Sequence, residues 1–157
     1  MKKVLVIGKF NTESFGMHIA ETLNDMGYQV LRFMPGCNAP QGGNILVHRM
    51  NQARRVLYDA TNGIPKMRIR RMKALWALVK GRKVDYVIVC HDFLQPAEVQ
   101  YLKDLTQAKI SMWFPDALVN FGKGYFMNAA YDGLFFKDPF IVKALLNVPQ
   151  SPVYYMP

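Results

Sequence analysis

The chain has 157 residues, of which 51% are hydrophobic and 20% are charged, and its formal net charge is +9. This length fits one domain with its own core, and the composition excludes a disordered tail and a membrane-spanning bundle. No apolar run approaches the roughly 20 residues of a membrane-spanning helix. The first residues lead directly into a strand-like segment, so we expect no signal peptide.

Short apolar runs alternate with helical patterns along the chain. The strands are expected at 4–7, 28–34, 86–90, 109–114, 133–136 and 153–155, and the helices at 16–26, 45–60, 65–80, 96–106, 118–128 and 140–146. Continuously apolar, β-branched runs are typical of strands buried on both faces, and alternation with helices implies parallel strands joined by right-handed crossovers. We therefore predict a single α/β domain over residues 1–157. Its sheet is doubly wound and Rossmann-like, with about six parallel strands and helices on both faces.

The two cysteines, Cys37 and Cys90, lie far apart and fit no metal-ligand spacing. Cys90 lies within an apolar strand, so we expect a buried, reduced thiol and a cytoplasmic location. His18 and His48 lie within expected helices and are interpreted as ordinary surface or core residues. No His, Cys, Asp or Glu cluster has metal spacing, so we predict no bound metal.

Ligands of doubly wound sheets bind beyond the carboxyl ends of the strands, near the point where the strand order reverses. The loop 8–16 follows the first strand, and its candidate binding residues are Gly8, Asn11, Thr12, Glu13 and Ser14. Its glycines permit close backbone approach, and the following helix N-terminus offers N–H groups to an anion or a sugar hydroxyl. The spacing matches neither the dinucleotide fingerprint nor the P-loop. A turn with a helix N-cap at Ser14 or Thr12 is the alternative.

Three further strand ends carry reactive groups. After the third strand, His91 is a candidate general base with the Asp92 carboxylate orienting its ring, although adjacent residues face one substrate only if the loop bends. The alternative is that Asp92 caps a turn. Asp116 follows the fourth strand, and three roles are open for it: a general base, an acceptor of a hydrogen bond from a sugar hydroxyl, or the N-cap of the next helix. After the fifth, Lys137 and Asp138 either bind a ligand or form an internal ion pair.

The positive charge is concentrated between Arg49 and Lys83, where eleven basic residues accompany one acid, so the segment carries about +10. In the helix expected at 65–80, one face is apolar, comprising Ile69, Met72, Leu75, Trp76 and Val79. The candidate residues for contact with an anionic surface are Arg54, Arg55, Arg68, Arg70, Arg71 and Lys73. Either this is a solvated face over a packed stripe, or it binds an anionic membrane, with Trp76 in the core or at the interface. Nucleic acid is the weaker option, because interleaved aromatic residues are missing.

Several strings of the chain resemble one known family. They are VIGKFNTESF (6–15), VCHDF (89–93), WFPDA (113–117), FFKDP (135–139) and the closing PVYYMP (152–157). The chain is similar, over essentially its whole length, to the N-terminal half of the CgeB-like, spore-maturation-type glycosyltransferases of the GT-B fold. The WFPD and FKDP strings are fairly specific, and the first strand is generic.

The resemblance implies a bacterial two-domain hexosyltransferase. In such an enzyme the N-terminal domain binds the acceptor, the C-terminal domain binds the nucleotide sugar, and transfer occurs in the cleft between them. The chain stops at Pro157, where the family continues, so we expect no cofactor and no turnover for this chain alone. By this analogy the loop 8–16, His91, Asp92 and Asp116 line the cleft. Several GT-B enzymes attach to anionic membranes through basic helices, which the charged segment would suit.

Two other function classes remain open. A receiver-like signalling module has a similar strand rhythm, with Asp92 near the phosphoacceptor position and Lys137 after the fifth strand. Against it, the first strand ends in Gly8-Lys9 and not in the acidic pair that would hold Mg²⁺. The third class is a non-catalytic binding or scaffold domain that keeps the fold, since folds of this kind host many functions.

Overall fold

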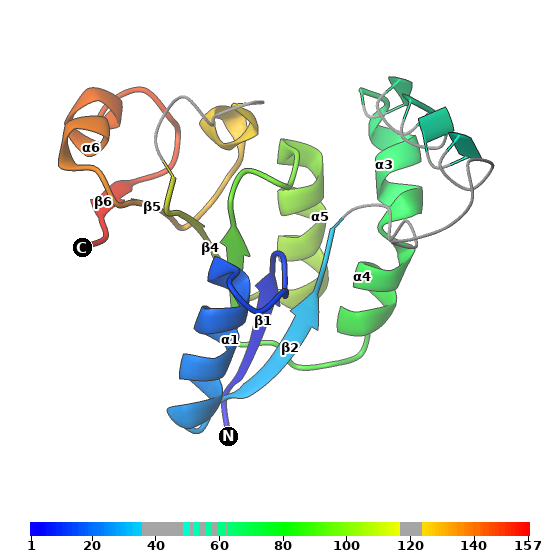
Figure 1. Cartoon of the computed structure of the whole chain (residues 1–157), viewed down its shortest axis with the longest axis horizontal. Coiled ribbons are helices and arrows are strands. Elements are labelled where there is room, and N and C mark those ends of the chain that lie inside the picture. Colours follow the sequence, from blue (N-terminus) through cyan, green and yellow to red (C-terminus); the bar gives the residue numbers. More distant parts are fainter. Residues whose placement is uncertain (36–48, 51, 54–55, 58–59, 62, 117–123) are drawn as a thin grey trace.

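The computed structural model describes residues 1–35, 49–50, 52–53, 56–57, 60–61, 63–116 and 124–157, without the side chains of residues 65 and 71. Its centre is a six-stranded, entirely parallel sheet (Figure 1). The strands are β1 (Lys3–Ile7), β2 (Gln29–Phe33), β3 (Tyr86–Cys90), β4 (Lys109–Phe114), β5 (Gly133–Phe136) and β6 (Val153–Tyr155). The predicted α/β, Rossmann-like fold with six parallel strands is confirmed.

The strand order is β2-β1-β3-β4-β5-β6. From β1 the chain moves to one side to form β2, and then returns to the opposite side of β1 to form β3. The order therefore reverses between β1 and β3. This is the flavodoxin-like order of doubly wound sheets with one added strand, and such sheets bind ligands at the reversal point. The loops after β1 and β3 flank that point.

Helices cover the two faces of the sheet unequally. They are α1 (Phe15–Asp25), α3 (Pro65–Arg71), α4 (Lys73–Val79), α5 (Pro96–Thr106), the 3₁₀ helix η2 (Tyr125–Asn128) and α6 (Pro139–Leu145). On one face, α1 packs over Val4, Val6 and Ile88. The opposite face carries the larger core, to which α4, α5, η2 and α6 contribute. Because both faces of β1 and β3 are buried, these strands read as continuous apolar runs.

On the α1 side, β4, β5 and β6 carry an aromatic row. Trp113, Phe135 and Tyr154 lie opposite one another in the strand register, with ring centroids 5.8 Å apart for the first pair and 5.1 Å for the second. Tyr154 is 46% exposed. An apolar hollow of about 360 Å³ lies beside this row and is also lined by Leu23 and Tyr28. Trp76, by contrast, lies on the opposite side, in the larger core.

The helix expected at 65–80 is two helices that meet at Met72, where the backbone leaves the helical region (ψ 17°). The predicted apolar face is confirmed, since Met72, Leu75, Trp76 and Val79 are buried. Trp76 belongs to the core: its indole N–H donates to the Ile69 carbonyl at 2.7 Å.

Other element boundaries are close to the predictions. Strands three to six and the helix at 96–106 coincide with the predicted ranges, and the first two strands differ by one residue at their ends. Of the helix expected at 118–128, residues 125–128 form η2, and residues 118–123 lie outside the described residues. Residues 45–48 of the helix expected at 45–60, which include His48, also lie outside the described residues, and so does Cys37. The described residues of 49–60 are helical.

Candidate functional site

His91 lies directly after β3, at the reversal point of the sheet. Its φ is 72°, a left-handed conformation that His, Asn and Asp tolerate better than most residues. Its N–H donates to the Trp113 carbonyl at 3.0 Å, and the Phe93 N–H donates back to the His91 carbonyl at 3.0 Å. The loop therefore bends sharply at the strand end, and His91 and Asp92 leave the strand in different directions.

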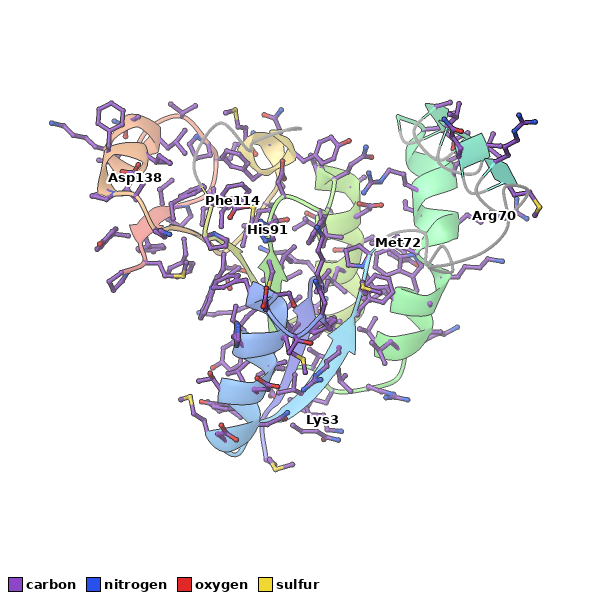
Figure 2. All side chains as sticks on the ribbon, viewed as in Figure 1. Lys3, Arg70, Met72, His91, Phe114 and Asp138 are labelled. Carbon is purple, nitrogen blue, oxygen red and sulfur yellow. The ribbon has the colours of Figure 1, made fainter. Side chains whose placement is uncertain are left out.

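The imidazole of His91 lies among three aromatic rings. The centroids of Phe15, Phe93 and Phe114 lie 6.5, 5.7 and 5.4 Å from it, all in edge-on geometry. Figure 2 shows His91 and Phe114 side by side where β3 and β4 end. This burial lowers the pKa of His91 below its usual value, because desolvation penalises the charged ring. A lowered pKa favours the neutral form of the ring, which is the form that can accept a proton.

Asp116 is the carboxylate nearest this ring. Its Oδ2 lies 3.5 Å from Nδ1 of His91, which leaves Nε2 as the atom that would accept a proton. Asp116 raises the pKa of His91 and Lys9 lowers it, and both effects are smaller than that of burial. A separation of 3.5 Å is long for a hydrogen bond, but catalytic pairs in ligand-free sites are often long and tighten with substrate. Asp116, and not Asp92, takes the orienting position.

Asp92 is turned toward the backbone of η2. Its Oδ2 accepts from the Tyr125 N–H at 2.7 Å and its Oδ1 from the Phe126 N–H at 3.0 Å. The geometry thus corresponds to the capping alternative, although the capped turn lies more than thirty residues downstream. Asp92 therefore joins the β3 loop to η2. Its effect on the site is to hold this loop in place.

The loop 8–16 follows β1, the strand next to β3. A Cβ added at Gly16 would lie 2.6 Å from the Lys9 carbonyl, so this position requires glycine. A Cβ added at Gly8 would lie 3.0 Å from the Cβ of Cys90, a tight contact that would need a small shift of that side chain. Ser14 stands at the N-cap position of α1, but its hydroxyl donates to the carbonyls of Lys9 and Asn11 at 2.7 and 2.8 Å and makes no side-chain cap.

The remaining candidates in this loop, Asn11, Thr12 and Glu13, are exposed. Their loop lies at the same edge of the sheet as His91, because β1 and β3 are neighbouring parallel strands.

Lys137 and Asp138 are not brought to this site. They follow β5, two strands from β3, which corresponds to about 10 Å across the sheet. Asp138 caps α6 by accepting from the Phe140 N–H at 2.8 Å, and Lys137 is exposed. In Figure 2, Asp138 lies at α6, well away from His91.

Arg68 requires a correction. It was expected to face an anionic surface, but it is 5% exposed and its guanidinium pairs with Glu98 in the core. A signal was present, since Arg68 precedes Met72, Leu75 and Val79 by four, seven and eleven residues and so shares their buried stripe. Arg70 and Lys73 are exposed as expected. Arg54 and Arg55 lie outside the described residues, and so does the side chain of Arg71.

The chain matches no family model, no curated protein and no solved structure. The resemblance to CgeB-like glycosyltransferases therefore stays a prediction, and function has to be argued from the site itself.

Two broader features bear on function. Within the described ranges, no three His, Cys, Asp or Glu side chains gather closely enough to hold a metal ion. The helices that the structure describes include none with the length and apolar character needed to cross a membrane.

Sequence reasoning identified His91 and Asp116 separately but missed their pairing and the surrounding rings of Phe15, Phe93 and Phe114. The only signal was that aromatic residues cluster near these strand ends. Together the groups can accept a proton at His91 Nε2, stabilise the resulting imidazolium through Asp116, and restrict water around the ring.

Proposed function

We propose that this chain is the acceptor-binding half of an enzyme that transfers a sugar from a nucleotide sugar to a hydroxyl group. One observation carries the proposal: a partly buried histidine, whose pKa is lowered by burial, has a carboxylate at its Nδ1 at the reversal point of a doubly wound sheet. A neutral imidazole oriented in this way is the side chain best suited to activate a hydroxyl near pH 7. The similarity of the strand-end strings to CgeB-like enzymes supports the same reaction class.

In the proposed reaction, His91 Nε2 removes the proton of the acceptor hydroxyl as its oxygen bonds to the anomeric carbon. The bond from that carbon to the nucleotide diphosphate breaks, and the diphosphate leaves with the bonding electron pair. Asp116 stabilises the imidazolium that forms. General-base catalysis of this kind contributes about 10²- to 10⁴-fold in rate.

The other candidate residues take supporting roles in this proposal. Asn11, Thr12 and Glu13, which are exposed in the loop 8–16, hydrogen-bond the acceptor. Asp92 is a positioning residue that fixes the β3 loop against η2. The nucleotide-sugar donor binds a second domain, so the 157-residue chain binds no cofactor. The buried, free thiol of Cys90 suits the cytoplasm.

A receiver-like module is the second candidate, because receivers share the strand order β2-β1-β3-β4-β5. The site favours it less. Both carboxylate oxygens of Asp92 already accept backbone N–H groups, and β1 is followed by Gly8-Lys9, without an acidic pair.

The decisive experiment joins this chain to its donor-binding domain and measures sugar transfer from radiolabelled UDP- and GDP-sugars to an extract of cellular hydroxyl acceptors. We expect His91→Gln to lower kcat about 10²-fold or more with little change in the KM for the donor. Lys143→Gln, an exposed residue on α6, is the matched control. A scaffold domain would give equal activity for His91→Gln and the control.

A second experiment titrates the 157-residue chain alone with UDP- and GDP-sugars by calorimetry. We expect no binding heat, because the proposal assigns the donor to another domain. Tight nucleotide binding would overturn the acceptor-side assignment and would make the loop 8–16 the nucleotide site.

A further inference from the structure

An apolar stripe in the segment 49–60 is open to solvent. The described residues of this segment are helical, and Ala53, Val56, Leu57 and Ala60 follow one another at spacings of three, one and three. That spacing places them on one helix face. Val56 is 64% exposed and Leu57 is 65% exposed. Exposed apolar residues that gather on one face are a common feature of interaction surfaces.

Two further apolar side chains are exposed at the start of α3. Ile64 is 47% exposed and Met67 is 43% exposed, and both are large side chains. They lie beside Lys66, which is also exposed. Aliphatic side chains and cations therefore alternate along the outer surface of this part of the chain.

The cations on α3 and α4 are unpaired within the part of the chain that the structure describes. Lys66, Arg70, Lys73 and Lys80 are exposed, and none lies within ion-pair distance of a described acid. Figure 2 shows Arg70 on the side of α3 that faces away from the sheet. The charges of these residues are thus available to a partner.

The same helix is anchored rigidly on its inner side. Arg68 makes two hydrogen bonds to Glu98 and a third, at 3.0 Å, to the Phe93 carbonyl. Arg68 therefore ties α3, the helix that carries Lys66 and Arg70, to the β3–α5 loop.

We propose that the described exposed residues of this part of the chain bind the surface of an anionic lipid bilayer. Val56, Leu57, Ile64 and Met67 enter the headgroup region, and Lys66, Arg70, Lys73 and Lys80 contact lipid phosphates. Basic helices with exposed aliphatic residues bind membranes in this way, and each cation near the surface adds to the attraction. This inference does not depend on the sugar-transfer proposal.

A nucleic acid fits the same surface less well. Proteins that bind single strands stack bases on exposed aromatic rings. Between Arg49 and Lys83 the sequence has two aromatic residues, Tyr58 and Trp76, and Trp76 is buried. Exposed aliphatic side chains give nothing on which a base can stack, whereas they favour the bilayer interface.

The location of this surface has a further consequence. Figure 1 shows α3 at the end of the molecule toward which the strands point, the edge that carries His91. Attachment through this surface would bring the candidate site close to the bilayer.

The test is co-sedimentation of the 157-residue chain with vesicles of phosphatidylcholine alone or of equal parts phosphatidylcholine and phosphatidylglycerol. We expect binding to the anionic vesicles only, and much weaker binding at about 1 M salt than at about 0.1 M, where the Debye length is roughly 10 Å. Equal binding to both vesicle types, or none to either, would overturn the proposal.

Variants separate the two parts of the surface. The triple variant Lys66→Gln, Arg70→Gln and Lys73→Gln should bind anionic vesicles about 100-fold more weakly. Its matched control removes three exposed lysines elsewhere, Lys2→Gln, Lys109→Gln and Lys143→Gln, and should bind much as the parent does. Equal losses in both variants would indicate net charge alone and contradict a defined surface.

The apolar pair is tested by Val56→Ser with Leu57→Ser, which should weaken vesicle binding at both salt concentrations. Circular dichroism checks that each variant is folded. A parallel titration with a fluorescent single-stranded oligonucleotide gives the remaining outcome: oligonucleotide binding tighter than vesicle binding, lost in the cationic triple variant, would replace the membrane by a nucleic acid.

Discussion

Arg68 and Glu98 form a two-pronged ion pair inside the protein. Nε of Arg68 lies 2.8 Å from Oε1 of Glu98, and Nη2 lies 2.7 Å from Oε2. Glu98 is 1% exposed, and its Oε2 also accepts the Gln95 N–H at the start of α5. The pair therefore joins α3 to α5, the helix that follows the β3 loop.

Breaking this pair should destabilise the protein strongly. We expect Glu98→Ala to lower the free energy of unfolding by about 3–5 kcal/mol, because the Arg68 guanidinium would stay buried without its partner. Urea denaturation measures the change. Glu21→Ala, on the exposed side of α1, is the control and should change stability little.

Replacing both members, as in Arg68→Met with Glu98→Leu, should recover most of the lost stability, since no charge then remains buried. A single Glu98→Ala variant as stable as the Glu21→Ala control would show that the pair contributes little.

For a substitution at Tyr131 we predict an increase in stability. Its hydroxyl is buried and has no hydrogen-bond partner among the residues that the structure describes, and burial together with the Asp92 and Glu98 charges raises its pKa well above the usual value. An unpartnered buried hydroxyl costs about 1–3 kcal/mol. Tyr131→Phe removes this cost and should raise the melting temperature in a thermal scan. A clear loss of stability would mean that the hydroxyl is satisfied in solution.

His91 should titrate below its usual pKa of 6.5. NMR of the imidazole C–H signals measures this, and His91→Asn identifies the signal. Asp116→Asn should lower the pKa of His91 further, because the Asp116 charge favours the imidazolium. Lys9→Gln should raise it, since the Lys9 charge opposes a second positive charge. A pKa above 6.5 in the parent protein would contradict the partly buried imidazole of lowered pKa on which the proposed function rests.

The same shift links His91 to stability. Because its pKa is lower in the folded state than in the unfolded state, the unfolded state binds more protons between the two values. The contribution of His91 is thus fully present above pH 6.5 and is lost as the pH falls through the folded-state pKa. Denaturation of the His91→Asn variant should depend less on pH in this range, and an unchanged pH dependence would contradict the assignment.

Cys90 should be chemically inert in the native state. Desolvation raises its pKa to about 12, and its Cβ faces Gly8 in the core. Since the thiolate is the reactive form, a Cys37→Ser variant should react with iodoacetamide only after denaturation. Mass spectrometry follows the modification. Rapid labelling of the folded variant would indicate that the β1–β3 contact opens readily.

Local patterns were sufficient to predict most elements of the fold. The run Tyr86–Cys90 is continuously apolar because both of its faces are buried, and Pro96 marks the first turn of α5. Parallel pairing followed from the alternation of these strands with helices. The order of the strands, and hence the reversal between β1 and β3, depends on tertiary packing that a single sequence does not display.

The candidate site was predictable only in part. His91 and Asp116 drew attention as reactive groups after strands, but their pairing requires β3 and β4 to be neighbours. Asp92 was expected beside the His91 ring, whereas its partners are backbone N–H groups more than thirty residues downstream. No local pattern encodes such contacts, because a carboxylate accepts backbone N–H groups of any residue type.

The two tryptophans lie on opposite faces of the sheet, Trp76 against Tyr101 in the larger core and Trp113 beside Phe135 on the α1 side. Each face thus has its own intrinsic fluorophore. In a Trp76→Phe variant the tryptophan emission would come from Trp113 alone and would respond to whatever covers the aromatic row. In Trp113→Phe the tryptophan emission would come from Trp76 and would follow the docking of α4 onto the core. Loosening of one layer can therefore be observed separately from loosening of the other.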